Sequence, residues 1–220
     1  MKKVVVWDLD GTILDTLDDL ADSVNFTMEY FGFAKFDVGE IRKKLGNGVK
    51  DLIQKSVPSD CVGDKFDKVL DFFKKHYFQN MNNKTRPYRG ICEVMEKLKN
   101  IGYRQAIVSN KFDDAVQELA KKYYPFVDLA VGERKDLKKK PCPDAVNWVL
   151  SKLKCDKNEA VYVGDSEVDL QTAKNSEIDC ISVLWGFRDR DFLEKNGAVI
   201  LVDNPNSLFN VLAEMRSLDD

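Results

Sequence analysis

The chain has 220 residues, of which 44% are hydrophobic and 32% charged, and its formal net charge at pH 7 is −3. This length allows one large domain or two small ones and is sufficient for a substantial hydrophobic core. The small negative charge provides no general attraction to nucleic acid or to anionic membranes. An anionic ligand would therefore need local positive groups or a metal ion.

No stretch of the sequence is typical of a membrane helix or of a secretory signal. No apolar run approaches the roughly 20 residues that a membrane helix needs. The apolar stretch after Lys2 and Lys3 stops at Trp7, short of the roughly 7–15 apolar residues of a signal peptide. We therefore expect a cytoplasmic protein without a membrane or nucleic-acid partner.

The cysteine and histidine content argues against several kinds of site. The five cysteines are an odd number without a Cys-x-x-Cys pair, which disfavours a disulfide framework and a zinc site. His76, the single histidine, lies in a Lys-rich helical stretch, where a surface or packing role is favoured over catalysis. Cys142 has no partner for nucleophilic work.

The first predicted element is a short buried strand at Val4–Trp7 that ends at two acids, Asp8 and Asp10. Strand geometry places these two residues on one face, at the edge where ligands bind in α/β sheets. Two carboxylates this close both ionise readily only with a cation or a shared proton, and Mg²⁺ prefers such oxygen ligands. One carboxylate could act as a nucleophile and the other as a general acid and base. The alternatives are a strand-end turn and a calcium loop, which the missing Glu at its twelfth position disfavours.

Residues from about 15 to 85 are expected to be helical, because no strand pattern interrupts them. Apolar residues recur at near-helical spacing until Gly32, and a short helix follows at 38–45. Another amphipathic turn begins at Val49 and stops at Pro58, and a further apolar face runs from Phe66 to Phe78.

From Pro87 onward the pattern alternates between helices and strands. Repeated βα units predict a mostly parallel sheet with helices on both faces, a Rossmann-like three-layer α/β/α core. The dinucleotide fingerprint and the Walker pattern are both absent from the sequence, which disfavours those folds. The predicted helices cover 91–100, 113–122, 144–153, 167–175 and 206–216, and the predicted strands cover 104–109, 127–131, 160–163, 178–184 and 198–202.

Four short motifs, in their order and spacing, resemble those of the haloacid dehalogenase-like hydrolases. Each motif alone is a weak signal, but together they span nearly the whole chain. The resemblance implies a core domain from residues 1–14 and 86–220, with a mobile helical cap domain at 15–85. The motifs are Asp8-Leu9-Asp10-Gly11-Thr12, Ser109-Asn110, Lys140 in Lys140-Pro141-Cys142-Pro143, and Gly164-Asp165-Ser166-Glu167-Val168-Asp169.

The resemblance also implies which residues hold the metal and start the reaction. Asp8 would be the nucleophile that forms an aspartyl-phosphate, and Asp10 would be the general acid and then the general base. A Mg²⁺ ion would be held by Asp8, by a main-chain carbonyl of Asp10 and by Asp165. Asp169 would support the metal indirectly, and Glu167 could contact it through water.

Other motif residues would contact the substrate. Ser109, Asn110 and Lys140 would meet the charge on the transferring phosphoryl group, whose stabilisation is largely electrostatic. Gly11 and Thr12 would lie against the same group, and Asn47 would reach it from the cap turn.

Asp10 separates the branches of this superfamily, because the dehalogenase branch lacks a carboxylate at that position. We therefore expect a Mg²⁺-dependent phosphatase that acts on a small-molecule phosphate ester, as a monomer or a homodimer. The cap turn Gly46-Asn47-Gly48 and the tail Trp185-Gly186-Phe187 resemble those of phosphoglycolate phosphatases, so 2-phosphoglycolate is the candidate substrate.

Three alternatives remain open on the sequence. The first, a phosphomutase resembling β-phosphoglucomutase, is disfavoured by Val49, where such mutases tend to carry an arginine. The second is a pyrophosphatase of the same superfamily, and the third is a non-catalytic binding protein on this scaffold. Lys50, Lys111 and Arg188 are candidate contacts for a substrate carboxylate or a second phosphate, although surface charge is the favoured interpretation of each.

Overall fold

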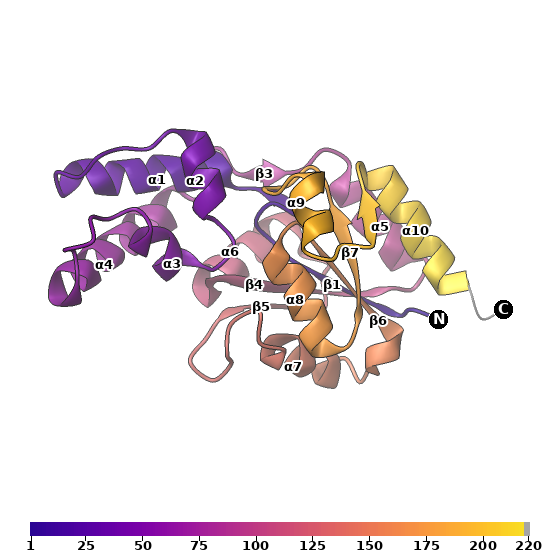
Figure 1. The fold of residues 1–220 in the computed structure, drawn as a ribbon. Helices are drawn as coiled ribbons and strands as arrows, with labels where there is room; N and C mark the ends of the chain where they lie inside the picture. The colour runs from indigo at the N-terminus through magenta and orange to yellow at the C-terminus, as the bar shows by residue number, and fades with distance from the viewer. Residues whose placement is uncertain (218–220) are drawn as a thin grey trace.

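A six-stranded parallel sheet forms the centre of the structure, a computed structural model that describes residues 1–217 (Figure 1). The strand order is β5-β4-β1-β6-β7-β8, and every neighbouring pair is parallel. This arrangement confirms the predicted α/β core. The strands are β1 (Val4–Trp7), β4 (Arg104–Phe112), β5 (Leu129–Glu133), β6 (Ala160–Gly164), β7 (Asp179–Val183) and β8 (Ile200–Val202).

The central strand β1 is buried on both faces, which explains its uninterrupted apolar sequence. Successive side chains of a strand point to opposite faces. Val5 and Trp7 accordingly belong to one hydrophobic core, and Val4 and Val6 belong to the other. The sheet therefore separates two layers of packing.

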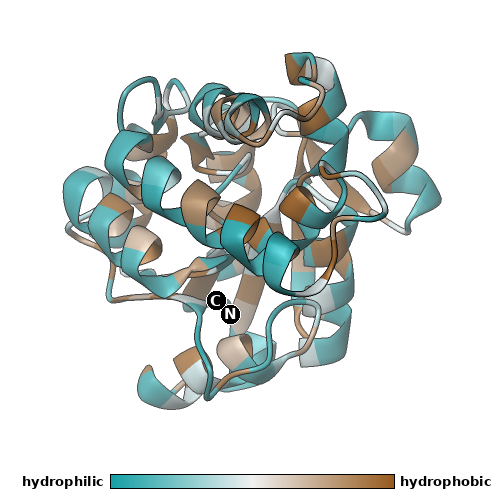
Figure 2. Ribbon diagram, turned by 90° about the vertical axis from the view of Figure 1, so that its left-hand side faces the viewer, coloured by the Kyte–Doolittle hydropathy of each residue, from teal (hydrophilic) through white to brown (hydrophobic). Residues whose placement is uncertain are grey.

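Helices cover both faces of the sheet. Apolar residues of α5, α6 and α10 join the core that contains Val5, and apolar residues of α7 and α8 join the core that contains Val4. Hydrophobic and hydrophilic residues alternate along the helices, as Figure 2 shows, with the apolar sides buried. These helices are α5 (Ile91–Asn100), α6 (Asp113–Tyr123), α7 (Asp144–Lys152), α8 (Glu167–Ser176) and α10 (Pro205–Ser217).

Four helices between β2 and β3 form a separate group at the left of Figure 1. We refer to residues 16–85, which contain them, as the helical insertion. A two-stranded antiparallel ribbon, β2 (Leu14–Asp15) with β3 (Arg86–Pro87), joins its two ends to the core. The helices are α1 (Leu17–Tyr30), α2 (Val38–Lys44), α3 (Val49–Gln54) and α4 (Gly63–Asn80).

The structure differs from the sequence prediction in a few elements. The ribbon strands β2 and β3 have two residues each, too short for an alternating pattern to be visible. Helix α9 (Arg190–Lys195) was not predicted either, although Asp189 caps its first turn. Strand β4 continues to Phe112 instead of ending at Ser109, because it rejoins β5 after an irregularity in the register.

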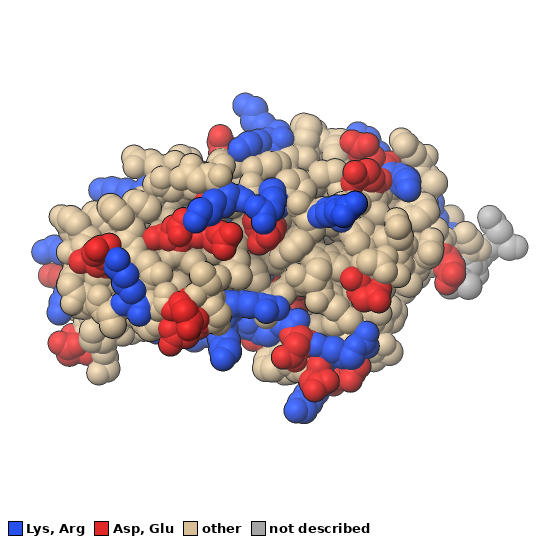
Figure 3. Space-filling view, turned by 90° about the horizontal axis from the view of Figure 1, so that it is seen from above, with Lys and Arg blue, Asp and Glu red and all other residues tan. Residues whose placement is uncertain are grey.

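Charged side chains of both signs are interspersed on the face seen in Figure 3. This distribution agrees with the small net charge of −3. Within residues 1–217, no helix combines the length and the apolarity needed to cross a membrane. An anionic ligand would therefore depend on local positive groups, since the overall charge does not attract it.

One buried acid fixes the returning end of the helical insertion to its first helix. Asp19 on α1 is almost fully buried. Its carboxylate accepts hydrogen bonds from the backbone N–H of Lys84 (3.0 Å) and of Thr85 (2.8 Å), just before β3. Asp18, one residue earlier on the same helix, is exposed.

We predict that Asp19→Ala lowers the free energy of unfolding by about 2 kcal/mol, because it leaves backbone donors without an acceptor. Urea denaturation followed by circular dichroism measures the change. Asp18→Ala, the matched control, should lose less than half as much. Equal losses in the two variants would show that the Asp19 hydrogen bonds do not stabilise this junction.

Candidate active site

The candidate site lies at the carboxyl edge of the sheet, where the chain changes sides. Strand β1 has β4 on one side and β6 on the other. In open α/β sheets ligands bind at such a switch point. Asp8 directly follows β1, Ser109 lies in β4, and Asp165 directly follows β6. Parallel strands thus bring together residues that are far apart in the sequence.

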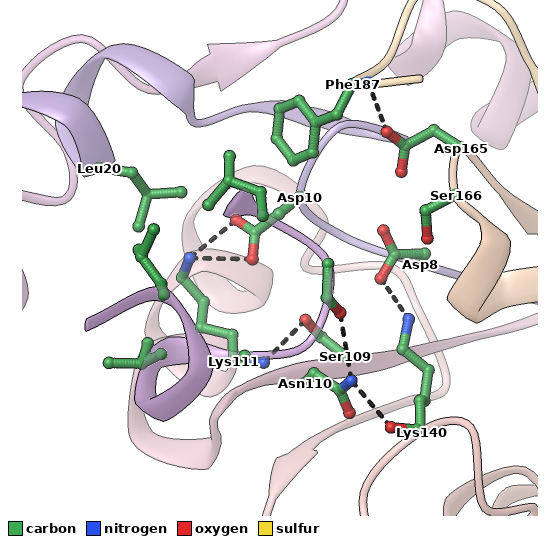
Figure 4. Close-up of a pocket in the computed structure, with 15 residues that line it drawn as sticks. Asp8, Asp10, Leu20, Ser109, Asn110, Lys111, Lys140, Asp165, Ser166 and Phe187 are labelled. Carbon is green, nitrogen blue, oxygen red and sulfur yellow. Dashed lines mark hydrogen bonds and ion pairs between the residues drawn. The ribbon is translucent and has the colours of Figure 1, made fainter. Parts of the chain in front are cut away.

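These residues line a cavity of about 50 Å³ between the core and the helical insertion (Figure 4). The core supplies almost all of its polar groups. The insertion supplies apolar side chains and the backbone of a glycine-containing turn. The lining residues are Asp8, Asp10, Ser109, Asn110, Lys111, Lys140, Asp165, Ser166 and Phe187 from the core, and Leu20, Leu45, Gly46, Gly48, Val49 and Leu52 from the insertion.

Lys140 is a buried cation that joins three groups of the core. Its Nζ lies 2.6 Å from Asp8 Oδ1 and 2.8 Å from Asp169 Oδ1, and it donates to the Tyr162 hydroxyl at 3.0 Å. Burial lowers the pKa of Lys140, but Asp169 and Asp8 outweigh this effect and hold its pKa well above the ordinary value. Lys140 is therefore charged, and it brings the predicted third motif into contact with the first and fourth.

The carboxylates outnumber this cation. Burial raises the pKa of Asp8 to about 7, although Lys140 opposes the effect. Burial, together with Asp8 and Asp169, also raises the pKa of Asp165 well above its ordinary value. The Asp165 carboxylate accepts from the Phe187 backbone N–H at 2.6 Å. One lysine thus faces three buried acids, and the local charge favours a further cation.

The donor set fits a hard divalent ion such as Mg²⁺. One carboxylate oxygen from each of Asp8, Asp165 and Asp169 lies within 4.8 Å of the others. All are oxygen ligands, which Mg²⁺ prefers. Both carboxylate oxygens of Asp169 already accept hydrogen bonds. Lys140 Nζ donates to its Oδ1, and the Ser166 hydroxyl donates to its Oδ2 at 2.6 Å. The support of a metal by Asp169 stays a prediction.

Glycines allow the chain to pass close to Asp165. A Cβ atom at Gly11 or at Gly186 would overlap the Asp165 side chain, and Gly11 has a positive φ of 90°. Thr12 lies beside them, and its hydroxyl is 3.2 Å from Asp8 Oδ2 and 3.3 Å from Asp165 Oδ1. Gly11 and Thr12 therefore shape the acidic cluster, and their direct contact with a substrate stays a prediction.

Lys111 is a site residue that the sequence prediction assigned to the surface. Its side chain is 2% exposed, so the interpretation as surface charge is wrong. Its Nζ lies 2.7 Å from Asp10 Oδ1 and 3.0 Å from Oδ2, and 4.7 Å from the centre of the Tyr77 ring on α4. Because β4 continues past Ser109, Lys111 also lies in this strand, and both residues line the cavity. A longer strand prediction would have placed Lys111 beside Ser109.

Ser109 and Asn110 occupy the space between the two lysines in Figure 4. Ser109 Oγ accepts from the Lys111 backbone N–H at 3.2 Å. The Asn110 amide donates to the Lys140 carbonyl at 3.1 Å and to the Gly46 carbonyl of the insertion at 3.3 Å. The second motif therefore connects the third motif to the insertion.

The turn of the insertion approaches the core through its backbone. A Cβ at Gly48, whose φ is +85°, would lie 2.9 Å from the Asn110 carbonyl oxygen. Between the two glycines, the Asn47 carbonyl accepts from Lys139 Nζ at 3.0 Å. Gly46 and Gly48 line the cavity, and Asn47 is absent from its lining among the described residues. A contact between the Asn47 side chain and the substrate stays a prediction.

Two arginines fasten the insertion onto the loop after β7. Arg42 on α2 donates to the Gly186 carbonyl at 2.6 Å. In the opposite direction, Arg188 donates to the Leu45 carbonyl at 2.7 Å and pairs with Glu167 at 2.8 Å. The surface interpretation of Arg188 is therefore wrong, since its side chain is 11% exposed. Glu167 is thus an ion-pair partner of Arg188, and a contact between Glu167 and a metal through water stays a prediction.

The remaining residues singled out in the sequence have simpler places. Lys50 is exposed, as expected. His76 stacks on Phe26 with ring centres 4.1 Å apart, and its Nδ1 lies 3.1 Å from Ser23 Oγ. It packs within the insertion, away from the acidic cluster. Cys142 is one of five free cysteines.

The fold and the site define a haloacid dehalogenase-like hydrolase. The model of the family described as haloacid dehalogenase-like hydrolase matches residues 5–183, and the chain belongs to this family. Within it, the chain resembles phosphoglycolate phosphatases. It is 32% identical over 192 residues to the phosphoglycolate phosphatase of Aquifex aeolicus, with 84% of this chain and 86% of that protein covered.

Two further comparisons agree. The chain is 28% identical over 220 residues to the phosphoglycolate phosphatase of Vibrio parahaemolyticus, with 96% of each chain covered. A crystal structure from Lactobacillus delbrueckii subsp. bulgaricus, provisionally named a phosphoglycolate phosphatase, superposes with a TM-score of 0.92. Its identity is 35%, with 96% of this chain and 99% of that one covered.

We predict that the metal-free protein loses stability between about pH 4 and pH 7, since the pKa of Asp8 rises on folding from 3.8 to about 7. In this window the folded state binds more protons than the unfolded state, so the free energy of unfolding falls as the pH rises. Asp8→Asn removes this effect and should be more stable than the wild type at pH 8, by roughly 1–3 kcal/mol.

Urea denaturation in EDTA at pH 5, 6, 7 and 8 tests this prediction. The gain of Asp8→Asn over the wild type should grow with pH. Asp18→Asn, an exposed acid on α1, should show no such trend. A gain for Asp8→Asn that is constant across the series would contradict the raised pKa of Asp8.

Proposed function

We propose that the protein is a Mg²⁺-dependent phosphatase that hydrolyses a small-metabolite phosphomonoester through an aspartyl-phosphate at Asp8, with 2-phosphoglycolate as its substrate. The observation that carries the proposal is the cavity lined by Asp8, Asp10, Ser109, Lys140 and Asp165 together. Four separate motifs of the sequence supply these residues. The phosphoglycolate phosphatases similar to this chain support the choice of substrate.

In the first step the Asp8 carboxylate would attack phosphorus. The bond between Asp8 and phosphorus forms, the ester P–O bond breaks, and the leaving alcohol takes a proton from Asp10. In the second step water attacks phosphorus and gives a proton to Asp10. The bond to Asp8 then breaks, which releases inorganic phosphate and regenerates both carboxyl groups.

Charge stabilisation would come from groups already in place. Lys140 touches Asp8, so it is positioned to hold the nucleophile ionised and to meet charge on the phosphoryl oxygens. Ser109 and the backbone at Asn110 would donate hydrogen bonds to the same oxygens. Bound Mg²⁺, held by Asp8, Asp165 and the Asp10 main-chain carbonyl, would neutralise charge on the phosphoryl group. The apolar insertion wall would exclude bulk water.

A phosphomutase has weaker support than a phosphatase. A mutase must bind a second phosphate, which calls for positive groups opposite the nucleophile. Opposite Lys140, the described lining of the cavity offers a single cation, Lys111, and the insertion residues that line the cavity are Leu, Val and Gly, without a charged side chain among them. A pyrophosphatase and a non-catalytic binding protein are two further candidate functions for this scaffold. Product analysis separates the enzymes, since they release one phosphate, an isomerised sugar phosphate, or two phosphates.

We predict that Asp8→Asn lowers phosphate release by at least about 1,000-fold, because an amide cannot form the acyl-phosphate. Release of inorganic phosphate from 2-phosphoglycolate and a panel of sugar phosphates, nucleotides and pyrophosphate measures the loss. Asp18→Asn should retain wild-type turnover, and circular dichroism should show both variants folded. Turnover by a folded Asp8→Asn protein would exclude the aspartyl-phosphate.

We predict that saturating Mg²⁺ raises the melting temperature of the wild type by about 5–10 °C, as expected for a ligand that binds only the folded state. Asp165→Asn should lose most of this shift, because it removes one of the three clustered carboxylates. Differential scanning calorimetry with and without Mg²⁺ measures the shift, and Asp18→Asn should keep it. A full shift in Asp165→Asn would place the metal elsewhere.

A further inference from the structure

We infer that Lys111 selects substrates that carry a carboxylate on the leaving group, close to the phosphate ester. The inference rests on the proposed phosphatase function and adds a specificity-determining residue to it. It places the carboxylate-binding position in the core, on strand β4.

The position of Lys111 relative to Asp10 is the first argument. A general acid must lie beside the leaving oxygen, so whatever surrounds Asp10 lines the leaving-group side of the cavity. Lys111 Nζ contacts both Asp10 oxygens, at 2.7 and 3.0 Å. In Figure 4 it approaches Asp10 from the side of Leu20, opposite to Lys140. Lys111 is therefore the cation that a substituent of the leaving group meets.

The charges of the cavity are the second argument. Among the described residues that line it, Lys111 and Lys140 are the cations. Lys140 is already bound to Asp8, Asp169 and the Tyr162 hydroxyl. Lys111 has one carboxylate partner, Asp10, whose side chain keeps 19% of its surface exposed. An ammonium has three donors, so Lys111 can bind a second carboxylate beside Asp10.

The walls around Lys111 are the third argument. The insertion places Leu20, Val49 and Leu52 in the cavity, and these side chains offer no hydrogen bond to a neutral polar group. Tyr77, in contact with Lys111 through its ring, holds the lysine from the insertion side. An anionic arm is the group that this end of the cavity matches.

The test compares 2-phosphoglycolate with 2-hydroxyethyl phosphate, an ester of the same length that has a neutral hydroxymethyl group in place of the carboxylate. The ratio of their kcat/KM values, measured by phosphate release at fixed Mg²⁺ and pH, isolates the contribution of the carboxylate. For the wild type we expect a ratio of about 30 or more, as a charge-assisted hydrogen bond provides. For Lys111→Met the ratio should fall to within about threefold of one, because the removed ammonium is the group that recognises the carboxylate.

Two variants make the comparison specific. Lys111→Arg retains the charge and should keep a preference for the carboxylate, at a reduced ratio because the geometry differs. Lys50→Met makes the same substitution at an exposed lysine of α3 and should keep the wild-type ratio. If Lys111→Met is unfolded by circular dichroism, Lys111→Gln replaces it, and the wild-type ratio still tests the inference.

The outcomes separate this inference from the function on which it rests. A wild-type ratio near one, or a Lys111→Met ratio equal to that of the wild type, overturns the role of Lys111 and leaves the phosphatase function intact. No phosphate release by the wild type from either ester or from any member of the wider panel overturns the proposed function itself.

Discussion

The site depends on one buried ammonium group, that of Lys140. Three carboxylates from two distant motifs meet in a volume from which water is largely excluded, and such a cluster repels itself unless cations intervene. Lys140 contacts two of them, Asp8 and Asp169, and leaves Asp165 with hydrogen-bond donors alone. The remaining negative charge is what suits the site to a divalent ion and to a reaction in which charge moves between oxygens.

A second ion pair, between Lys111 and Asp10, lies on the other side of the cavity. Lys140 pairs with carboxylates of the acidic cluster. Lys111 pairs with Asp10 and contacts the Tyr77 ring of the helical insertion. In the proposed mechanism, Lys140 would lie at the end of the cavity that holds the phosphoryl group, and Lys111 at the end that holds the rest of the substrate. Ser109 and Asn110 lie between them and connect both ends through strand β4.

The sequence was sufficient to predict the α/β core, because its strands and helices are long enough for their apolar periods to show. It also singled out Asp8, Lys140 and Asp165, since each belongs to a motif with a fixed order in the chain. Lys111 and Arg188 were misjudged as surface charges. Their burial comes from contacts with the insertion, at Tyr77 and at the carbonyls of Arg42 and Leu45, and no local pattern records such contacts.

The arginines that fasten the insertion have a consequence for how this scaffold acquires new specificities. Arg42 and Arg188 bind main-chain carbonyls, those of Gly186 and Leu45, so the bonds do not depend on the side chain at the acceptor position. Leu45 nevertheless contributes its side chain to the cavity wall. A substitution there changes the shape of the pocket and leaves the attachment in place. The attachment of the insertion and the shape of the cavity thus depend on different groups. Residues of the cavity wall can change without loss of the arginine bonds that hold the insertion on the core.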